Sequence, residues 1–250
     1  FALVPLYTSY FNTSEYGVID LIQTIVIIAT IFGMIQMESA LQRFFYDYSG
    51  NKRKLFITNI FLLVFVLSSL IGAIGVLIAN FVSNSLLGSS EYSYALKVSF
   101  CQIPFINLSI LGLIIVRFQK QNLRFILLIL FKVFLTIIFV GLFVIYLSLG
   151  IEGVFNAQLL VSVLSAIAVL FVIRENFCQL KLNRHFLNEV IHYGLPLFPA
   201  RIGSIANSYG NRFFLISYLS VSTIGIFSVS LKWASIVQFL YTCFVMAWNP

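Results

Sequence analysis

Charged side chains are scarce in this chain. Of its 250 residues, 9% are charged and 60% are hydrophobic, and the mean hydropathy is +1.02. A soluble domain carries about 25% charged residues, so this chain lacks the polar side chains needed to cover a water-facing surface. The bilayer must solvate much of it, and the composition therefore predicts an all-α polytopic membrane protein.

Motifs for metals, cofactors and catalysis are also missing. The cysteines Cys101, Cys178 and Cys243 lie far apart and form no CxxC or Cys/His spacing, so we predict neither a metal site nor a disulfide framework. The sequence has no Gly-rich phosphate loop, no HExxH and no Ser/His/Asp signature, and we expect no cofactor. The net charge of +7 is carried between hydrophobic runs rather than on a polar domain, which argues against nucleic-acid binding.

Hydrophobic runs separated by short polar connections fill the chain instead. A membrane-spanning helix needs about 20 mainly apolar residues, and we predict eight such segments, the first incomplete. They cover residues 1–11, 18–42, 55–83, 93–116, 124–148, 153–173, 190–218 and 223–247. No connection is long enough to form a soluble catalytic domain, so we expect a transporter rather than an enzyme.

Basic residues gather on alternate connections. Ten of the 15 lysines and arginines flank the second, fourth and sixth connections. The positive-inside rule places these connections in the cytoplasm. The ten residues are Arg43, Lys52, Arg53, Lys54, Arg117, Lys120, Arg124, Arg174, Lys181 and Arg184.

A weak internal repeat is visible. Gly17 aligns with Gly225, 208 positions later, and Ser14 then aligns with Ser222. In both places a short polar loop leads through a glycine into a long hydrophobic helix of the same orientation. This predicts two parallel halves related by an axis along the membrane normal, an arrangement that many transporters share.

Two carboxylates lie within the second predicted span. At about 100° per residue, Asp20 and Glu38 fall on the same side of a helix over 18–42. This polar stripe should face a cavity or the interior of the bundle, because ionisable groups are costly in lipid. Either carboxylate could bind a proton or Na⁺ during a transport cycle. The alternative is that both lie near the membrane interfaces and are simply hydrated.

Three basic residues, Lys132, Arg201 and Lys232, lie deep within predicted spans, and Arg212 lies near the outer end of one. A cation in a low-dielectric site attracts anions strongly, and arginine can hold phosphate in a bidentate manner. We expect these residues to bind the phosphate or glycan of a substrate. The alternative is pairing with a buried carboxylate or snorkelling to the interface, which explains Arg212 most easily.

Pro196 and Pro199 lie near the start of segment 190–218. Proline inside a helix frees a backbone carbonyl and permits a bend, which would suit a gating helix. The alternative is an ordinary helix start at the interface, where proline is favoured in the first turn.

Six short stretches have a recognisable order and spacing over nearly the whole chain. They are Ser14-Glu15-Tyr16-Gly17, Ser39-Ala40-Leu41-Gln42-Arg43-Phe44, Tyr193-Gly194-Leu195-Pro196-Leu197, Asn211-Arg212-Phe213-Phe214-Leu215, Gly225-Ile226-Phe227-Ser228-Val229 and Ala247-Trp248-Asn249-Pro250. Together they resemble the bacterial O-antigen and capsule repeat-unit flippases of the multidrug/oligosaccharidyl-lipid/polysaccharide exporter superfamily. Asn211 departs from that family, in which Asp often precedes the Arg, and so weakens any coupling role at this position.

The resemblance implies two six-helix bundles around a central cavity. We expect residues 1–175 to form the first bundle, 176–189 a cytoplasmic linker, and 190–250 the first two helices of a second bundle. The second bundle is expected to be truncated, because the chain begins inside an apolar stretch and ends abruptly where a helix meets a loop.

The resemblance further implies translocation of polyprenyl-diphosphate-linked oligosaccharides across the bacterial cytoplasmic (inner) membrane by alternating access. The process would serve surface polysaccharide or lipopolysaccharide biosynthesis, with polysaccharide polymerase machinery as a further partner. One alternative is a cation-coupled multidrug exporter of the same superfamily, which the intramembrane cations disfavour. Another is a membrane glycosyltransferase or polymerase, which would need large polar catalytic loops.

Overall fold

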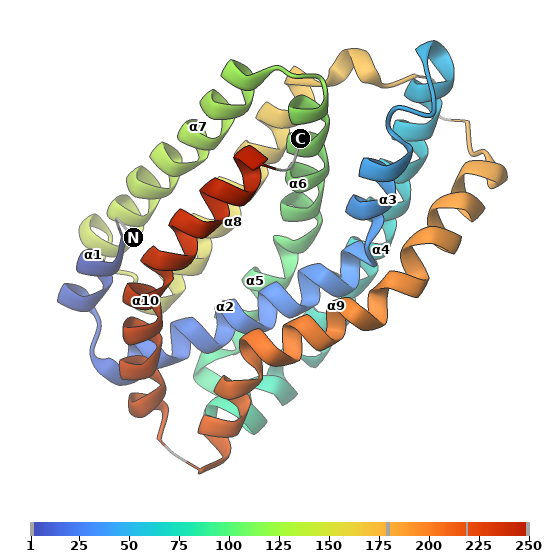
Figure 1. Ribbon diagram of the computed structural model, residues 1–250. Helices are drawn as coiled ribbons and strands as arrows, with labels where there is room; N and C mark the ends of the chain where they lie inside the picture. Colours follow the sequence, from blue (N-terminus) through green and yellow to red (C-terminus); the bar gives the residue numbers. More distant parts are fainter. Residues whose placement is uncertain (1–2, 179–180, 219, 249–250) are drawn as a thin grey trace.

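The chain folds into long helices that run back and forth between two ends of the molecule (Figure 1). The computed structural model describes residues 3–178, 181–218 and 220–248, and no strand occurs among them. The helices are α1 (Leu3–Tyr10), α2 (Thr13–Met34), α3 (Met37–Phe44), α4 (Gly50–Leu87), α5 (Ser93–Cys101), α6 (Ile103–Phe118), α7 (Asn122–Val140), α8 (Gly150–Val172), α9 (Arg184–Tyr218) and α10 (Val221–Trp248). Three short helical turns complete the fold: η1 (Ser90–Tyr92), η2 (Gly141–Tyr146) and η3 (Arg174–Asn176).

Five described stretches are long and apolar enough to cross a membrane. They are Thr13–Met34, Gly50–Leu87, Ser90–Phe118, Asn122–Tyr146 and Gly150–Val172. The last two predicted spans correspond to α9, with 35 residues, and α10, with 28 residues. The predicted all-α, multi-pass membrane architecture is therefore confirmed.

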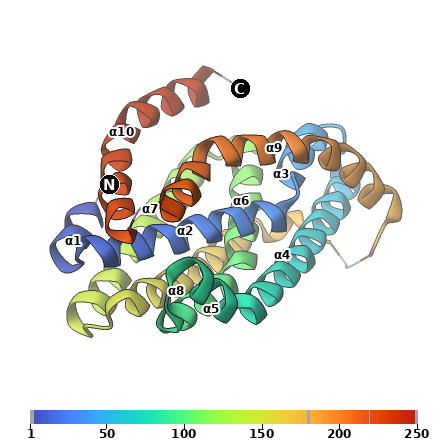
Figure 2. The ribbon, with the colours of Figure 1, turned by 90° about the horizontal axis from the view of Figure 1, so that it is seen from below.

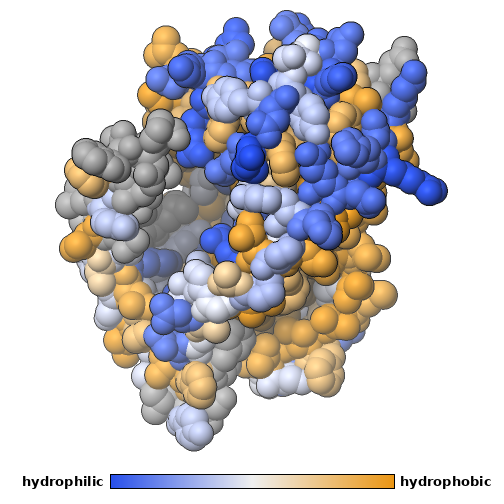
Figure 3. Space-filling view, turned by 45° about the vertical axis from the view of Figure 1, so that its right-hand side comes forward, coloured by the Kyte–Doolittle hydropathy of each residue, from blue (hydrophilic) through white to orange (hydrophobic). Residues whose placement is uncertain are grey.

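The connections rich in basic residues lie at one end of the molecule. The links from α3 to α4, from α6 to α7 and from α8 to α9 all lie at the upper end of Figure 1. Figure 3 shows hydrophilic residues gathered over this end and apolar residues over the lower right flank. This arrangement agrees with the orientation predicted from charge, with the upper end in the cytoplasm.

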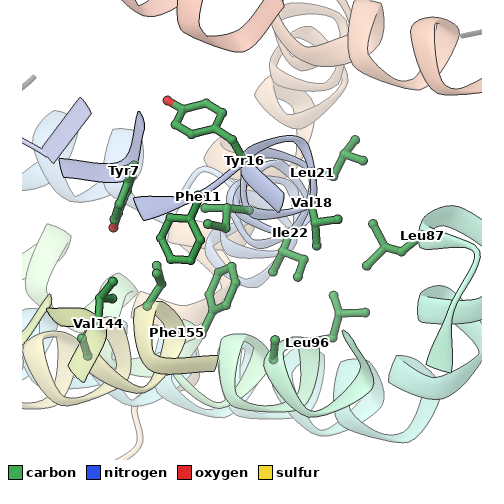
Figure 4. Packing of buried hydrophobic residues seen from close by; sticks show 14 of the residues in the cluster. Tyr7, Phe11, Tyr16, Val18, Leu21, Ile22, Leu87, Leu96, Val144 and Phe155 are labelled. Atoms are coloured by element: carbon green, nitrogen blue, oxygen red, sulfur yellow. The ribbon is translucent and has the colours of Figure 1, made fainter. Parts of the chain in front are cut away.

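Two buried hydrophobic clusters hold the helices together, one near each end. The outer cluster joins α1, α2, α5 and α8 through residues such as Phe11, Ile22 and Phe155 (Figure 4). The cytoplasmic cluster includes Phe56 of α4 and Phe186 of α9, whose ring centroids lie 5.7 Å apart. The second cluster therefore fixes the start of α9 against the preceding helices.

The predicted span 18–42 is not one helix. α2 ends at Met34, and Ile35 and Gln36 have left-handed φ values of 44° and 59° before α3 begins. Such a backbone is uncommon for residues that carry a side chain. Glu38 therefore belongs to a separate helix, and the prediction of one continuous polar stripe from Asp20 to Glu38 is wrong.

Two neighbouring helices stabilise this break. The Gly33 carbonyl lies in the last turn of α2 and lacks an intrahelical donor, which Ser68 of α4 supplies, and Asn107 of α6 adds a further donor one turn earlier. Ser68 Oγ donates to the Gly33 carbonyl at 3.2 Å, and Asn107 Nδ2 donates to the Thr30 carbonyl at 3.1 Å. Asn107 also donates to Ser68 Oγ at 2.6 Å, so the donors form one connected network.

Removal of the Asn107 amide should destabilise the protein. We expect Asn107→Leu to lower the free energy of unfolding by ~1–3 kcal/mol, because it removes the buried hydrogen bonds to the Thr30 carbonyl and to the Ser68 hydroxyl. Ser109→Ala is the matched control, since Ser109 Oγ bonds only the Phe105 carbonyl of its own helix. Unfolding of the purified protein in mixed micelles measures both. Equal losses in the two variants would contradict this role of Asn107.

α9 passes directly over the break. A methyl carbon placed on Gly194 would lie 3.1 Å from the Ile35 carbonyl oxygen and 3.4 Å from that of Gln36. Pro196 and Pro199 lie inside α9, twelve or more residues after its start at Arg184, so their interpretation as an ordinary helix start is wrong. Figure 2 shows α9 following an arched path across α2. The gating role of the two prolines stays a prediction.

The close approach at Gly194 gives a second prediction about stability. Gly194→Val should push α9 away from the break and lower the melting temperature by several degrees, because a branched side chain cannot fit against the backbone oxygens. Gly203→Val, in the same helix, is the control, since a Cβ there meets nothing within 4 Å. Thermal unfolding in detergent compares the two, and a larger loss for Gly203→Val would refute the argument.

Candidate functional site

The outer ends of α2 and α10 cross in very close contact. A methyl carbon on Gly17 would lie 2.2 Å from the Val221 carbonyl oxygen, and one on Gly225 would lie 2.0 Å from the Thr13 carbonyl oxygen. Only glycine permits this approach of two backbones. We call the contact region the outer junction. It consists of Thr13, Gly17 and Asp20 of α2, Arg212 of α9, and Ser222, Gly225 and Ser228 of α10.

The outer junction joins positions that are equivalent in the predicted repeat. Each glycine faces the carbonyl oxygen four residues before the other glycine. Ser228 Oγ donates to Asp20 Oδ2 at 2.7 Å, and these two residues are 208 positions apart, as are Gly17 and Gly225. The two repeat-equivalent segments therefore meet about an approximate two-fold axis. The division of the chain into two bundles stays a prediction.

A buried ion pair strengthens the outer junction. Arg212 Nε donates to Asp20 Oδ2 at 2.6 Å, and the two side chains are 11% and 6% exposed. The same carboxylate oxygen accepts the Ser228 hydroxyl, so one carboxylate links α2, α9 and α10. The predicted coupling residue Asp20 and the predicted substrate residue Arg212 thus neutralise each other in this conformation. Their roles in transport stay predictions.

Lys232 lies one helical turn beyond the ion pair. Its ammonium donates to the Tyr16 hydroxyl at 2.6 Å and lies 4.8 Å from the centroid of the same ring. Tyr16 is a neutral partner, and no ion pair to Lys232 is found among the residues that the structure describes. This cation therefore keeps an unneutralised charge that an anionic group could use.

Arg201 and Glu38 lie away from the outer junction, at the break in the second span. Arg201 is exposed on α9, and its charge acts on Glu38, although the two do not form an ion pair within 4.0 Å. Glu38 Oε2 is buried and has no hydrogen-bond partner in the described part of the chain. A buried carboxylate oxygen without a donor is a candidate for proton or cation binding.

Lys132 lies in a different part of the fold from the other cations. It lines a cavity of about 320 Å³ together with Gln23, Gln102 and Gln158, which come from α2, the α5–α6 turn and α8. The structure thus brings Asp20, Arg212 and Lys232 into one region and leaves Lys132 apart from them, on α7.

Sequence reasoning missed two members of the region around the outer junction. Ser228 is the repeat equivalent of Asp20, so the 208-residue repeat contained the signal that could have identified it. Tyr16 lies in the stretch Ser14-Glu15-Tyr16-Gly17, but nothing in the sequence connects its hydroxyl to a lysine 216 positions later. Within the described ranges, no group of three His, Cys, Asp or Glu side chains is placed to hold a metal ion.

The cytoplasmic end contains a second set of contacts between segments far apart in the chain. The Tyr48 hydroxyl donates to the Glu189 carboxylate. Burial, together with this carboxylate, raises the pKa of Tyr48 to about 12, so Tyr48 remains a donor at neutral pH. The predicted linker 176–189 is fixed to α4 and is partly helical, since Asn183 N–H donates to Asn59 Oδ1 at 2.9 Å and α9 begins at Arg184.

Comparison with known proteins places the chain in a family. Neither a curated protein nor a solved structure matches it. The family described as polysaccharide biosynthesis protein matches residues 1–250, and so includes both halves that meet at the outer junction. This match confirms the family suggested by the six short stretches and indicates a role in polysaccharide biosynthesis or export. The chain therefore belongs to the polysaccharide biosynthesis protein family.

Proposed function

We propose that this protein is a transporter that moves polyprenyl-diphosphate-linked oligosaccharide repeat units across the bacterial cytoplasmic (inner) membrane. The family supports a role in polysaccharide biosynthesis or export. The observation that carries the proposal is the outer junction. There the repeat-related helices α2 and α10 cross at Gly17 and Gly225, and the buried Asp20–Arg212 ion pair lies beside the crossing. Beyond this contact α10 rises toward the cytoplasmic end (Figure 1) and diverges from α2 (Figure 2). Such an arrangement corresponds to a transporter that is closed outside and open inside.

The charges suggest how the substrate is held. The diphosphate is an anion. The Lys232 ammonium bonds the neutral Tyr16 hydroxyl near the outer junction, while Arg201 is exposed on the neighbouring helix nearer the break. We assign these two cations to the diphosphate at successive depths of its path, because phosphate oxygens satisfy ammonium and guanidinium donors that lack a carboxylate. Arg212 would join them when the outer junction opens and releases it from Asp20. We assign Lys132 to the glycan, since three carboxamides surround it and can bond sugar hydroxyls.

Opening of the outer junction would complete the cycle. Separation of α2 from α10 breaks the contact between Asp20 and Arg212 and frees the Asp20 carboxylate. The freed carboxylate, and Glu38 at the break, could then take up a proton or Na⁺, which would couple transport to an ion gradient. This process makes and breaks no covalent bond, so we assign no catalytic residue and no cofactor.

A deletion strain tests the proposal. Cells without the gene should lose surface polysaccharide and accumulate the lipid-linked repeat unit, with its glycan in the cytoplasmic leaflet. The full-length gene should restore the polysaccharide, whereas the double variant Lys232→Met/Arg201→Gln should restore less than a tenth of it at equal membrane levels. Lys97→Gln is the control, since Lys97 lies on α5 outside the proposed path.

Two results would contradict the proposed function in different ways. Unchanged surface polysaccharide in the deletion strain would refute the transport of repeat units, and a simultaneous loss of drug resistance would favour a multidrug exporter. Full restoration by the double variant would leave transport standing but would refute the assignment of the diphosphate to Lys232 and Arg201.

A further inference from the structure

α7 and α8 enclose an apolar groove that the transport proposal does not use. The groove has a volume of about 670 Å³. Its walls are aliphatic and aromatic side chains, and its single charged lining residue is Arg124. The apolar lining consists of Leu127, Leu128, Leu130, Phe131 and Phe134 of α7 and Ala168, Phe171 and Val172 of α8.

Two arginines stand at the cytoplasmic end of this groove. Arg124 lines it near the start of α7, where Arg124 Nη1 donates to Gln121 Oε1 at 3.0 Å. The Arg174 guanidinium lies 4.6 Å from the centroid of the Phe171 ring, which is part of the groove wall. Both arginines are exposed, and neither forms an ion pair among the described residues. The groove thus combines an apolar body with a cationic mouth.

The length of the groove limits what it can hold. From Arg124 to Phe134 the helix advances ten residues, or about 15 Å. This is about half of the ~30 Å hydrocarbon core of a bilayer. The groove therefore extends through the cytoplasmic leaflet only. A membrane helix of a partner would need a groove through both leaflets, whereas a lipid of one leaflet fits this length.

We propose that the α7–α8 groove binds an anionic phospholipid of the cytoplasmic leaflet. The phosphate would lie between Arg124 and Arg174, and an acyl chain would lie along Leu127, Phe131 and Phe171. Basic pockets between membrane helices on the cytoplasmic side are suited to anionic headgroups. The groove is lined by α7 and α8, and none of the cations assigned to the substrate is among its lining residues. We therefore take its lipid to be a resident and not the cargo. This proposal is independent of the transport function.

Quenching by brominated lipids tests the proposal. The full-length protein, with Leu127→Trp as a reporter in the groove, is reconstituted in phosphatidylcholine vesicles that contain increasing brominated phosphatidylglycerol. We expect phosphatidylglycerol to bind about fivefold more tightly than phosphatidylcholine for each arginine involved. Arg124→Gln/Arg174→Gln should reduce the preference to within twofold. Lys120→Gln, a neighbouring cation that does not line the groove, should leave it unchanged.

A second reporter separates the groove from the general surface. Val133→Trp lies on another side of α7, outside the groove, and should show no preference beyond twofold. Equal quenching by the two lipids at Leu127→Trp, or an unchanged preference in the double arginine variant, would overturn the proposal. Stronger displacement of the brominated lipid by a polyprenyl phosphate than by unlabelled phosphatidylglycerol would also overturn it and would assign the groove to a substrate tail. Size-exclusion chromatography verifies that each variant is folded.

Discussion

Replacing Gly225 with alanine should abolish transport while the protein still inserts into the membrane. The added methyl carbon would lie 2.0 Å from the Thr13 carbonyl oxygen, and a backbone oxygen within a helix cannot move aside as a flexible side chain can. The outer ends of α2 and α10 would be held apart, so the closed-outside conformation could not form. We expect surface polysaccharide to fall at least tenfold in the deletion strain that expresses Gly225→Ala. The amount of protein in the membrane fraction is measured alongside.

A cross-link reports on the closure directly. Thr13 Oγ1 and Ser222 Oγ lie 2.8 Å apart across the outer junction. Cysteines at these two positions, in a chain whose native cysteines are replaced by serine, should form a disulfide that Gly225→Ala prevents. Gly17→Ala should act similarly, since its methyl carbon would lie 2.2 Å from the Val221 carbonyl oxygen.

Gly203→Ala is the matched control for both glycine variants. A Cβ at this position meets nothing within 4 Å, so cross-linking and transport should remain normal. Efficient cross-linking together with normal transport in Gly225→Ala would show that the glycine crossing is not required.

Loss of Asp20 should destabilise the protein and stop transport. Asp20→Ala leaves the Arg212 guanidinium, which is 11% exposed in the native pair, without a counter-charge. Breaking a buried ion pair from one side costs ~3–5 kcal/mol, because the remaining charge stays desolvated. We expect Arg212→Met to have a similar effect. Unfolding of the purified variants in mixed micelles measures the loss.

The double variant separates a structural role from a coupling role. Asp20→Leu/Arg212→Met removes both charges, and we expect it to regain most of the lost stability, since apolar replacements of buried pairs are often neutral. Transport should stay absent if the freed Asp20 carboxylate binds the coupling ion. Recovery of both stability and transport would limit the pair to a structural role. Arg43→Gln is the control, because the Arg43–Asp47 pair is exposed and contributes about 0–1 kcal/mol.

The local composition of the chain was enough to predict that it lies in a lipid bilayer and how it is oriented there. Long apolar runs with few charges require helices in a bilayer, because every backbone group must be satisfied within its own segment. The alternation of basic connections then predicts which end faces the cytoplasm. The sequence also contained the 208-residue repeat. Asp20 and Ser228 are equivalent in this repeat and are in contact in the structure, because equivalent positions of two parallel repeats approach each other at their common axis.

Only the tertiary structure decided which charges meet and where the second span breaks. Neither Ile35 nor Gln36 is glycine or proline, and Gly33, the nearest glycine, still lies within α2. The side-chain donors at the break come from α4 and α6, far along the chain. Asp20 and Arg212 are 192 positions apart, so their pairing depends on how α9 packs against α2. Hydropathy is a property of each segment and can be summed along the chain. A buried contact depends on the relative position of two segments, which packing alone specifies.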